Sequence, residues 1–170
     1  MTDAVSTAVT PKQQYLNALE QETGITLRVL QALPPDKSEL KPSEILKNAR
    51  ELAWMFVVEQ GAAMAAIRGE MSFPPAFPPA PENYQEVVAA FEASSNQLRE
   101  LVESTPDEEF NETTQFYVAP HQLGDLPKLQ FLWFMLCDMI HHRGQFSVYV
   151  RLAGGKVPSI YGPTAEEPWF

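Results

Sequence analysis

The sequence predicts an all-α protein, a four-helix bundle in which a long crossover joins the second and third helices. Four long segments carry apolar residues at a helical period, strand-like alternation is scarce, and two of the connections between helices are long. The 170 residues fit one domain, and a hydrophobic fraction of 45% is enough to form a core.

The first helix is predicted over residues 11–33. Thr10 suits the N-cap position and Pro11 the first helical position. The helical period then continues as far as Pro34, which ends it. Residues 1–10 are small and polar, so we expect a flexible N-terminus before the helix.

The second helix is predicted over residues 43–68, with Ser43 as its cap and with Ile45 and Phe56 on one apolar face. The stretch Gly69–Pro81 that follows contains five prolines, which exclude a helix and favour an extended chain. Extended, it reaches about 40 Å, roughly the length of a bundle helix. The third helix can therefore run parallel to the second, up-down-down-up, which a short loop would not permit.

The third helix is predicted over residues 82–104. A short alternating stretch at 114–118 can pair as a small strand. Asp125 is predicted to cap the fourth helix, over residues 126–153. The tail after it is rich in proline and aromatic residues, and we expect it to pack back on the bundle, so that residues 11–170 form a single domain.

The composition limits the possible partners and location of the protein. The net charge is −10 and Lys and Arg do not cluster, which argues against nucleic-acid binding and against docking on an anionic membrane. No apolar run is long enough to span a membrane, and Met1–Val5 does not read as a signal peptide. The single cysteine, Cys137, fits a reducing compartment, so we expect a cytoplasmic protein.

Aromatic residues are more abundant on the predicted helices than four helices can easily bury among themselves. Exposed apolar patches mark interfaces, so the surplus predicts a homodimer. The residues concerned are Trp54, Phe131, Trp133 and Phe134.

The segment Cys137–Gln145 is the most informative in the chain, because it holds two of the three histidines. Asp138 and His142 are four residues apart and therefore project from the same helix face. That spacing allows both to bind one divalent ion, with a third ligand from another element. The same spacing also occurs where a helix packs a polar face against a neighbour or turns it to solvent.

The neighbours of these two residues have simpler interpretations. His141 points about 100° away from His142 and is interpreted as a surface or hydrogen-bonding residue. Arg143 is expected to form an ion pair with an acidic neighbouring helix. Gly144 predicts the close approach of another group, and Cys137 is interpreted as a small buried apolar residue.

Three segments together resemble the DinB-like family, also called the DinB/YfiT family, whose members are proposed to be metalloenzymes. They are Tyr15–Pro34, the run Glu-Leu-Ala-Trp-Met at 51–55, and Asp138–Gln145 with the later Gly-Gly-Lys-Val-Pro at 154–158. The resemblance implies a bundle with parallel second and third helices. It also implies three metal-binding histidines, one on the second helix and two on the last, and several relatives are thiol-dependent transferases or isomerases.

The chain departs from that ligand set at two of three positions. Met55 and Asp138 stand where the family has histidine, and only His142 is kept. Met suits divalent ions poorly, whereas Asp138 can bind Zn²⁺, Ni²⁺ or Mn²⁺ through oxygen. Glu59, four residues after Met55, is the best candidate for the third ligand. Alternatively, Glu59 faces water or pairs with a cation, and Met55 fills the core.

These substitutions predict a DinB-like protein whose metal site is lost or weakened and which acts as a small-ligand-binding or interaction protein, with no metal cofactor. The alternative is a divalent-metal-dependent thiol S-transferase-type enzyme that uses Asp138, His142 and a carboxylate of the second helix. A third interpretation is a homodimer whose apolar surface serves assembly only. The sequence names no substrate.

Overall fold

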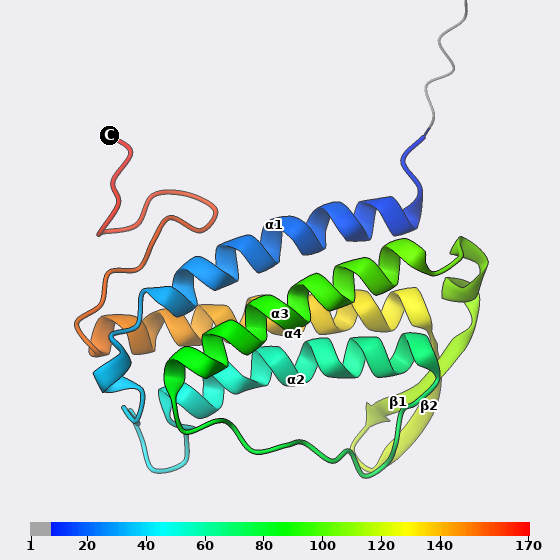
Figure 1. Cartoon of the computed structure of the whole chain (residues 1–170), viewed down its shortest axis with the longest axis horizontal. Coiled ribbons are helices and arrows are strands. Elements are labelled where there is room, and N and C mark those ends of the chain that lie inside the picture. The colour runs from blue at the N-terminus through cyan, green and yellow to red at the C-terminus, as the bar shows by residue number, and fades with distance from the viewer. Residues whose placement is uncertain (1–7) are drawn as a thin grey trace, which may run out of the picture.

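A computed structural model of the chain describes residues 8–170, and four long helices make up most of it (Figure 1). The helices are α1 (Pro11–Gln31), α2 (Ala49–Arg68), α3 (Tyr84–Ser104) and α4 (Lys128–Leu152). Two short 3₁₀ helices, η1 (Pro35–Lys37) and η2 (Asp107–Asn111), and two strands, β1 (Thr113–Ala119) and β2 (Gln122–Pro127), lie between them. The helical fold is thus as predicted, but a purely all-α description is wrong because of the small sheet.

Helix α1 begins where the sequence predicts. The Thr10 side chain accepts a hydrogen bond from the backbone N–H of Gln13, and Pro11 is the first helical residue. This arrangement satisfies one of the N–H groups that a helix start leaves without a partner.

Helix α2 begins at Ala49, so the predicted start at residue 43 is wrong. Asn48 accepts a hydrogen bond from the backbone N–H of Glu51, and the Glu51 carboxylate accepts one from the backbone N–H of Asn48. This reciprocal cap sets the start of the helix. Ile45, expected on the apolar face, lies before it and is 92% exposed.

The direction of α2 relative to α3 follows from the contacts between them. The rings of Phe56 and Phe91 meet edge to face at 6.0 Å, and further along both helices the Gln60 amide donates to Ser95. Residue numbers rise together along the pair, so the two helices run in the same direction (Figure 1). The proline linker returns along the outside of α2, where the Trp54 indole N–H donates to the Pro78 carbonyl at 2.7 Å.

Helix α4 packs against α2 in the opposite direction. Phe56 contacts Phe146, while Glu59, later on α2, contacts His142, which is earlier on α4. Helix α1 packs against α3 and α4, which completes the bundle (Figure 1). Side chains from all four helices therefore share one apolar core.

The strands form a hairpin at the end of the bundle from which α4 starts (Figure 1). The strand predicted at 114–118 is confirmed as β1, but its partner β2 was not predicted. Asp125 was expected to cap α4, and it instead pairs with Gln115 inside the sheet. Helix α4 consequently begins at Lys128 rather than residue 126, and its N-cap residue is Pro127.

The aromatic residues that predicted a homodimer are not equally accessible. Phe131 is fully buried in the core, so its expected place in an interface is wrong. Trp133 is half-buried with its ring against Tyr15, and Phe134 is 50% exposed. The homodimer itself stays a prediction.

Within residues 8–170, no helix combines the length and hydrophobicity needed to cross a bilayer. The chain before residue 8 lies outside the described residues, and so does most of the N-terminal segment predicted to be flexible.

A buried ion pair ties α1, α4 and the C-terminal tail together. The Arg143 guanidinium is 2.7 Å from the Glu22 carboxylate, and both side chains are buried. The Tyr161 hydroxyl, from the tail, donates to Glu22 and accepts from Arg143. The predicted ion pair of Arg143 with a neighbouring helix is therefore confirmed.

We expect Arg143→Ala to lower the free energy of unfolding by about 3–5 kcal/mol, because it leaves the Glu22 carboxylate buried without its counter-charge. Urea unfolding of the two proteins measures the difference. Arg99→Ala is the control: it removes an exposed pair with Glu103 and should cost only a few tenths of a kcal/mol, as is typical of such pairs. Equal losses in both variants would contradict the role assigned to Arg143.

Candidate metal centre

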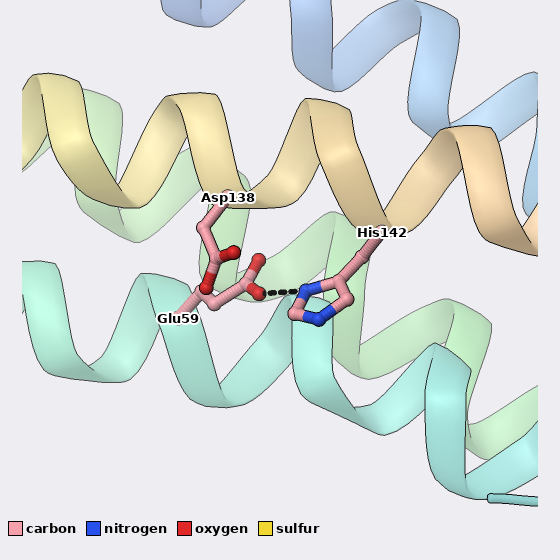
Figure 2. Close-up of side chains that lie close together, drawn as sticks. All are labelled: Glu59, Asp138 and His142. Carbon is pink, nitrogen blue, oxygen red and sulfur yellow. Dashed lines mark hydrogen bonds and ion pairs between the residues drawn. The ribbon is translucent and has the colours of Figure 1, made fainter. Parts of the chain in front are cut away.

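The candidate site lies between α2 and α4, which the apolar core holds side by side. Figure 2 shows Glu59 reaching from α2 toward α4, while Asp138 and His142 reach back from successive turns of α4. The four-residue spacing puts the last two on one face of α4, as the sequence predicts. Because α2 and α4 are antiparallel neighbours, the three side chains converge in one place.

The three residues are close enough to share one ion. Each contributes one potential ligand atom, and these atoms all lie within 4.8 Å of one another. Glu59 Oε1 is 2.5 Å from His142 Nδ1, a short contact between a carboxylate and an imidazole. A divalent ion has its ligand atoms about 2.0–2.2 Å away, so Glu59 and His142 would have to move apart to take the ion between them.

Glu59 is the most unusual residue of the three, because it is a carboxylate that is only 5% exposed. Its Oε1 atom contacts His142, but its Oε2 atom is buried and has no hydrogen-bond partner among the described residues. Leaving a buried polar atom without a partner costs about 1–3 kcal/mol, and more if it is charged. A cation bound beside Oε2 would supply the missing partner, so the donor set fits a metal.

The other two ligand candidates are partly open to solvent. Asp138 and His142 are half-buried, and the His142 and Phe56 rings meet in a T-shaped arrangement at a centroid distance of 6.4 Å. This contact was not predicted, although Phe56 lies three residues before Glu59 and so on a neighbouring part of the same face. The apolar ring limits how the imidazole can turn.

The electrostatics of the cluster favour a bound proton. The pKa of Glu59 is raised to about 7, chiefly by burial; the hydrogen bond and charge of His142 oppose the shift, and the nearby charge of Asp138 adds to it. The hydrogen bond to Glu59 likewise raises the pKa of His142 above its ordinary value, although burial opposes it. Both shifts have the same sign, so the folded Glu59–His142 pair retains a proton near neutral pH.

The structure also locates the other residues that the sequence analysis singled out near the site. Met55 is half-buried, one turn before Glu59 on α2. The interpretation that Glu59 faces water is wrong. His141 is exposed and its ring bonds with the Gln145 amide, which confirms its assignment as a surface residue.

Two expectations for the neighbouring residues of α4 are wrong. Cys137 is exposed, not buried, because it lies on the outer side of α4. A Cβ atom at Gly144 would meet nothing within 4 Å in the described part of the chain, so the space beside this glycine is open.

The structure holds a cavity of about 380 Å³ elsewhere, between α2, α3 and the proline linker. Met55, Asp138 and His142 do not line it. This cavity is therefore separate from the candidate metal ligands.

Comparison with known proteins identifies one family. A sequence profile described as the DinB family matches residues 1–169. The Bacillus subtilis (strain 168) protein YrdA, itself named as uncharacterized, is 26% identical over 155 residues, which make up 90% of this chain and 89% of YrdA.

Solved structures share the fold. A DinB-like protein from Bacillus cereus ATCC 10987 has a TM-score of 0.73 at 20% identity, covering 86% of this chain and 95% of its own. The DinB-like protein YjoA from Bacillus subtilis has a TM-score of 0.69 at 17% identity, with coverages of 86% and 97%. A conserved protein from Enterococcus faecalis has a TM-score of 0.67 at 14% identity, with coverages of 88% and 100%.

We expect the metal-free protein to lose stability as the pH rises from about 4.5 to 7. The pKa of Glu59 is about 7 in the folded chain against an ordinary 4.5, so the folded state binds more protons than the unfolded state in this range. At about 1.4 kcal/mol per pKa unit, the loss due to Glu59 is roughly 3 kcal/mol. The raised pKa of His142 extends the loss above pH 6.5.

Urea unfolding at a series of pH values, with chelator present, measures this loss. Glu59→Gln is neutral at every pH and should remove most of the decline, so the difference between the two proteins isolates the Glu59–His142 pair from the other titrating groups. Parallel curves for the two proteins would show that the Glu59 pKa is not raised by folding.

Proposed function

The chain belongs to the DinB family, and we propose that it binds one divalent metal ion between α2 and α4 through Glu59, Asp138 and His142. The observation that carries the proposal is the buried Oε2 atom of Glu59, which has no partner in the described part of the chain. A protein that had abandoned the metal would gain stability by replacing this carboxylate with an apolar residue. The proposal takes up the alternative that the sequence offered.

The ligand types indicate which ions the site would take. Two carboxylates and one imidazole form a harder set than three histidines, and such a set suits Mn²⁺, Zn²⁺ or Ni²⁺. When bound, such an ion supplies a Lewis acid that lowers the pKa of a coordinated thiol or water. Because Asp138 and His142 are partly exposed, an exogenous molecule can approach from the solvent side of the cluster.

The residues themselves control a proton at the site. Near neutral pH the Glu59–His142 pair holds a proton, which a metal ion has to displace, so the apparent affinity for metal rises with pH. The Glu59 carboxylate is buried, and the low dielectric of a buried site strengthens its interaction with a cation. We propose that the exogenous molecule that approaches the bound ion is a thiol substrate or cofactor, as in the S-transferase alternative.

The second candidate is a ligand-binding or interaction protein without metal. The observation that favours it is the 2.5 Å contact between Glu59 and His142, which pairs two of the three ligands with each other. Under this alternative a proton permanently takes the place of the cation. Metal titration separates the two functions.

We expect the protein, stripped with chelator and then dialysed against Mn²⁺ or Zn²⁺, to retain one equivalent by elemental analysis. Free ion at 100 times Kd should add about 2.7 kcal/mol to the free energy of unfolding and raise Tm by roughly 5–10 °C. His142→Ala should lose both effects. His141→Ala, which removes the exposed neighbouring histidine, should keep them. Retention of metal by His142→Ala, or no retention by the parent chain, would refute the proposed site.

We also expect the double variant Met55→His and Asp138→His to shift metal preference toward Ni²⁺ and Zn²⁺. It restores the histidines that the family resemblance implies, and softer nitrogen ligands disfavour Mn²⁺. Competition dialysis should show the ratio of Zn²⁺ to Mn²⁺ affinity rising by roughly tenfold or more. Met55→His alone, which keeps Asp138, is the control. An unchanged ratio in the double variant would mean that position 138 does not contact the ion.

A further inference from the structure

The cavity under the proline linker has the properties of a binding site. Its volume of about 380 Å³ falls in the range of small-molecule sites, about 300–1,000 Å³. Its floor is the outer face of α2, with Trp54, Val58 and Ala62, and its cover is the linker with Phe77 and Pro78.

The linker is fastened over this space and does not fill it. The Trp54 indole N–H donates to the Pro78 carbonyl at 2.7 Å, which holds the linker across the helix. Toward the other end, the residues facing the linker are small, among them Gly61, Ala62 and Ala65. Small side chains under a tethered, proline-stiffened strap leave a lasting space, because the strap cannot collapse onto the helix.

The lining determines the kind of molecule that fits. Most of the exposed lining is apolar, and Glu70 is the one ionisable residue among those of residues 8–170 that line it. Arg68, in the same turn, does not line the cavity. Glu70 also follows the C-terminus of α2, where the helix dipole favours positive charge.

From this lining we propose that the cavity binds an organic cation with an apolar body, of the alkylammonium type. The apolar body lies along Val58, Ala62 and Phe77, and the ammonium group meets the Glu70 carboxylate at the edge. A fatty acid of the same length would bring its carboxylate to Glu70 and be repelled. The site is independent of the proposed metal centre, because α2 presents Glu59 to α4 and presents these residues to α3 and the linker.

The test uses three ligands with one chain length and different head groups: n-octylammonium, n-octanol and n-octanoate. Each is titrated into the whole metal-free protein by calorimetry, with the indole N–H signals followed by NMR. We expect octylammonium to bind most tightly and octanoate most weakly, with the Trp54 signal shifting and those of Trp133 and Trp169 unchanged. Absence of binding at millimolar ligand, or octanoate binding as well as octylammonium, overturns the proposal.

Glu70→Gln tests the charge. It should weaken octylammonium about three- to fivefold, as expected for an exposed ion pair, and leave octanol unchanged. The same octylammonium affinity in this variant would show that Glu70 does not select the cation and would overturn the assigned ligand class.

Gly61→Leu tests the location. A Cβ atom at Gly61 meets nothing within 4 Å, so the first side-chain atom of leucine enters without a clash, and leucine favours a helix more than glycine does. It should weaken all octyl ligands roughly tenfold or more by displacing at least two buried methylene groups. Gly24→Leu, at another open helix-interior glycine on α1, is the matched control and should bind as the parent does. Unchanged binding in Gly61→Leu, or equal weakening in both variants, overturns the site.

Discussion

The architecture depends on the crossover between α2 and α3. A short loop after Gly69 would return α3 antiparallel to α2, but the proline-rich segment carries the chain back along the full length of α2 before α3 begins (Figure 1). Helix α2 is therefore parallel to α3 and antiparallel to α4. One flank of α2 faces α4 with Glu59, and the opposite flank lies beneath the linker with Trp54. Both candidate sites exist because of this single connection.

On the side of α2 that faces α4, the occupancy of the site depends on what stabilises the buried Glu59 carboxylate. Glu59 can be stabilised by a proton, by a protonated His142 or by a metal ion, and these compete for the same atoms. The imidazole contact satisfies Oε1 alone, and a proton on Oε2 would remove its charge but leave a buried O–H group without an acceptor. A divalent ion, by contrast, can also take Asp138 as a ligand, whose negative charge otherwise adds to the unfavourable field at Glu59.

The sequence predicted those parts of the site and the fold that depend on local spacing. The four-residue separations of Asp138 from His142 and of Met55 from Glu59 fix relative positions on a helix, and tertiary packing cannot alter them. The parallel arrangement could be argued from linker length alone. Both predictions follow from the dimensions of a helix and of an extended chain.

The predictions that were wrong concern which face of a helix is buried and which of two nearby residues caps a helix. Helix α4 carries large apolar residues on its exposed side as well, including Phe134 and Val148, so its pattern did not reveal that Cys137 faces outward. At the start of α2, Ser43 and Asn48 are both good caps, and only Asn48 has a glutamate three residues later that completes the capping box. The strand β2 lacks clear alternation, so its pairing with β1 had no local signal.

The two proposed sites would divide cations by size and hydration. A net charge of −10 draws cations toward the whole surface but does not sort them. Between α2 and α4, ligand atoms within 4.8 Å of one another leave room for a bare metal ion and exclude an alkylammonium chain. Under the linker, the interaction with one carboxylate does not offset the free energy of dehydrating a divalent ion. An alkyl chain, by contrast, is stabilised by burial against Val58 and Ala62. Local geometry thus assigns hard ions to one flank of α2 and apolar cations to the other.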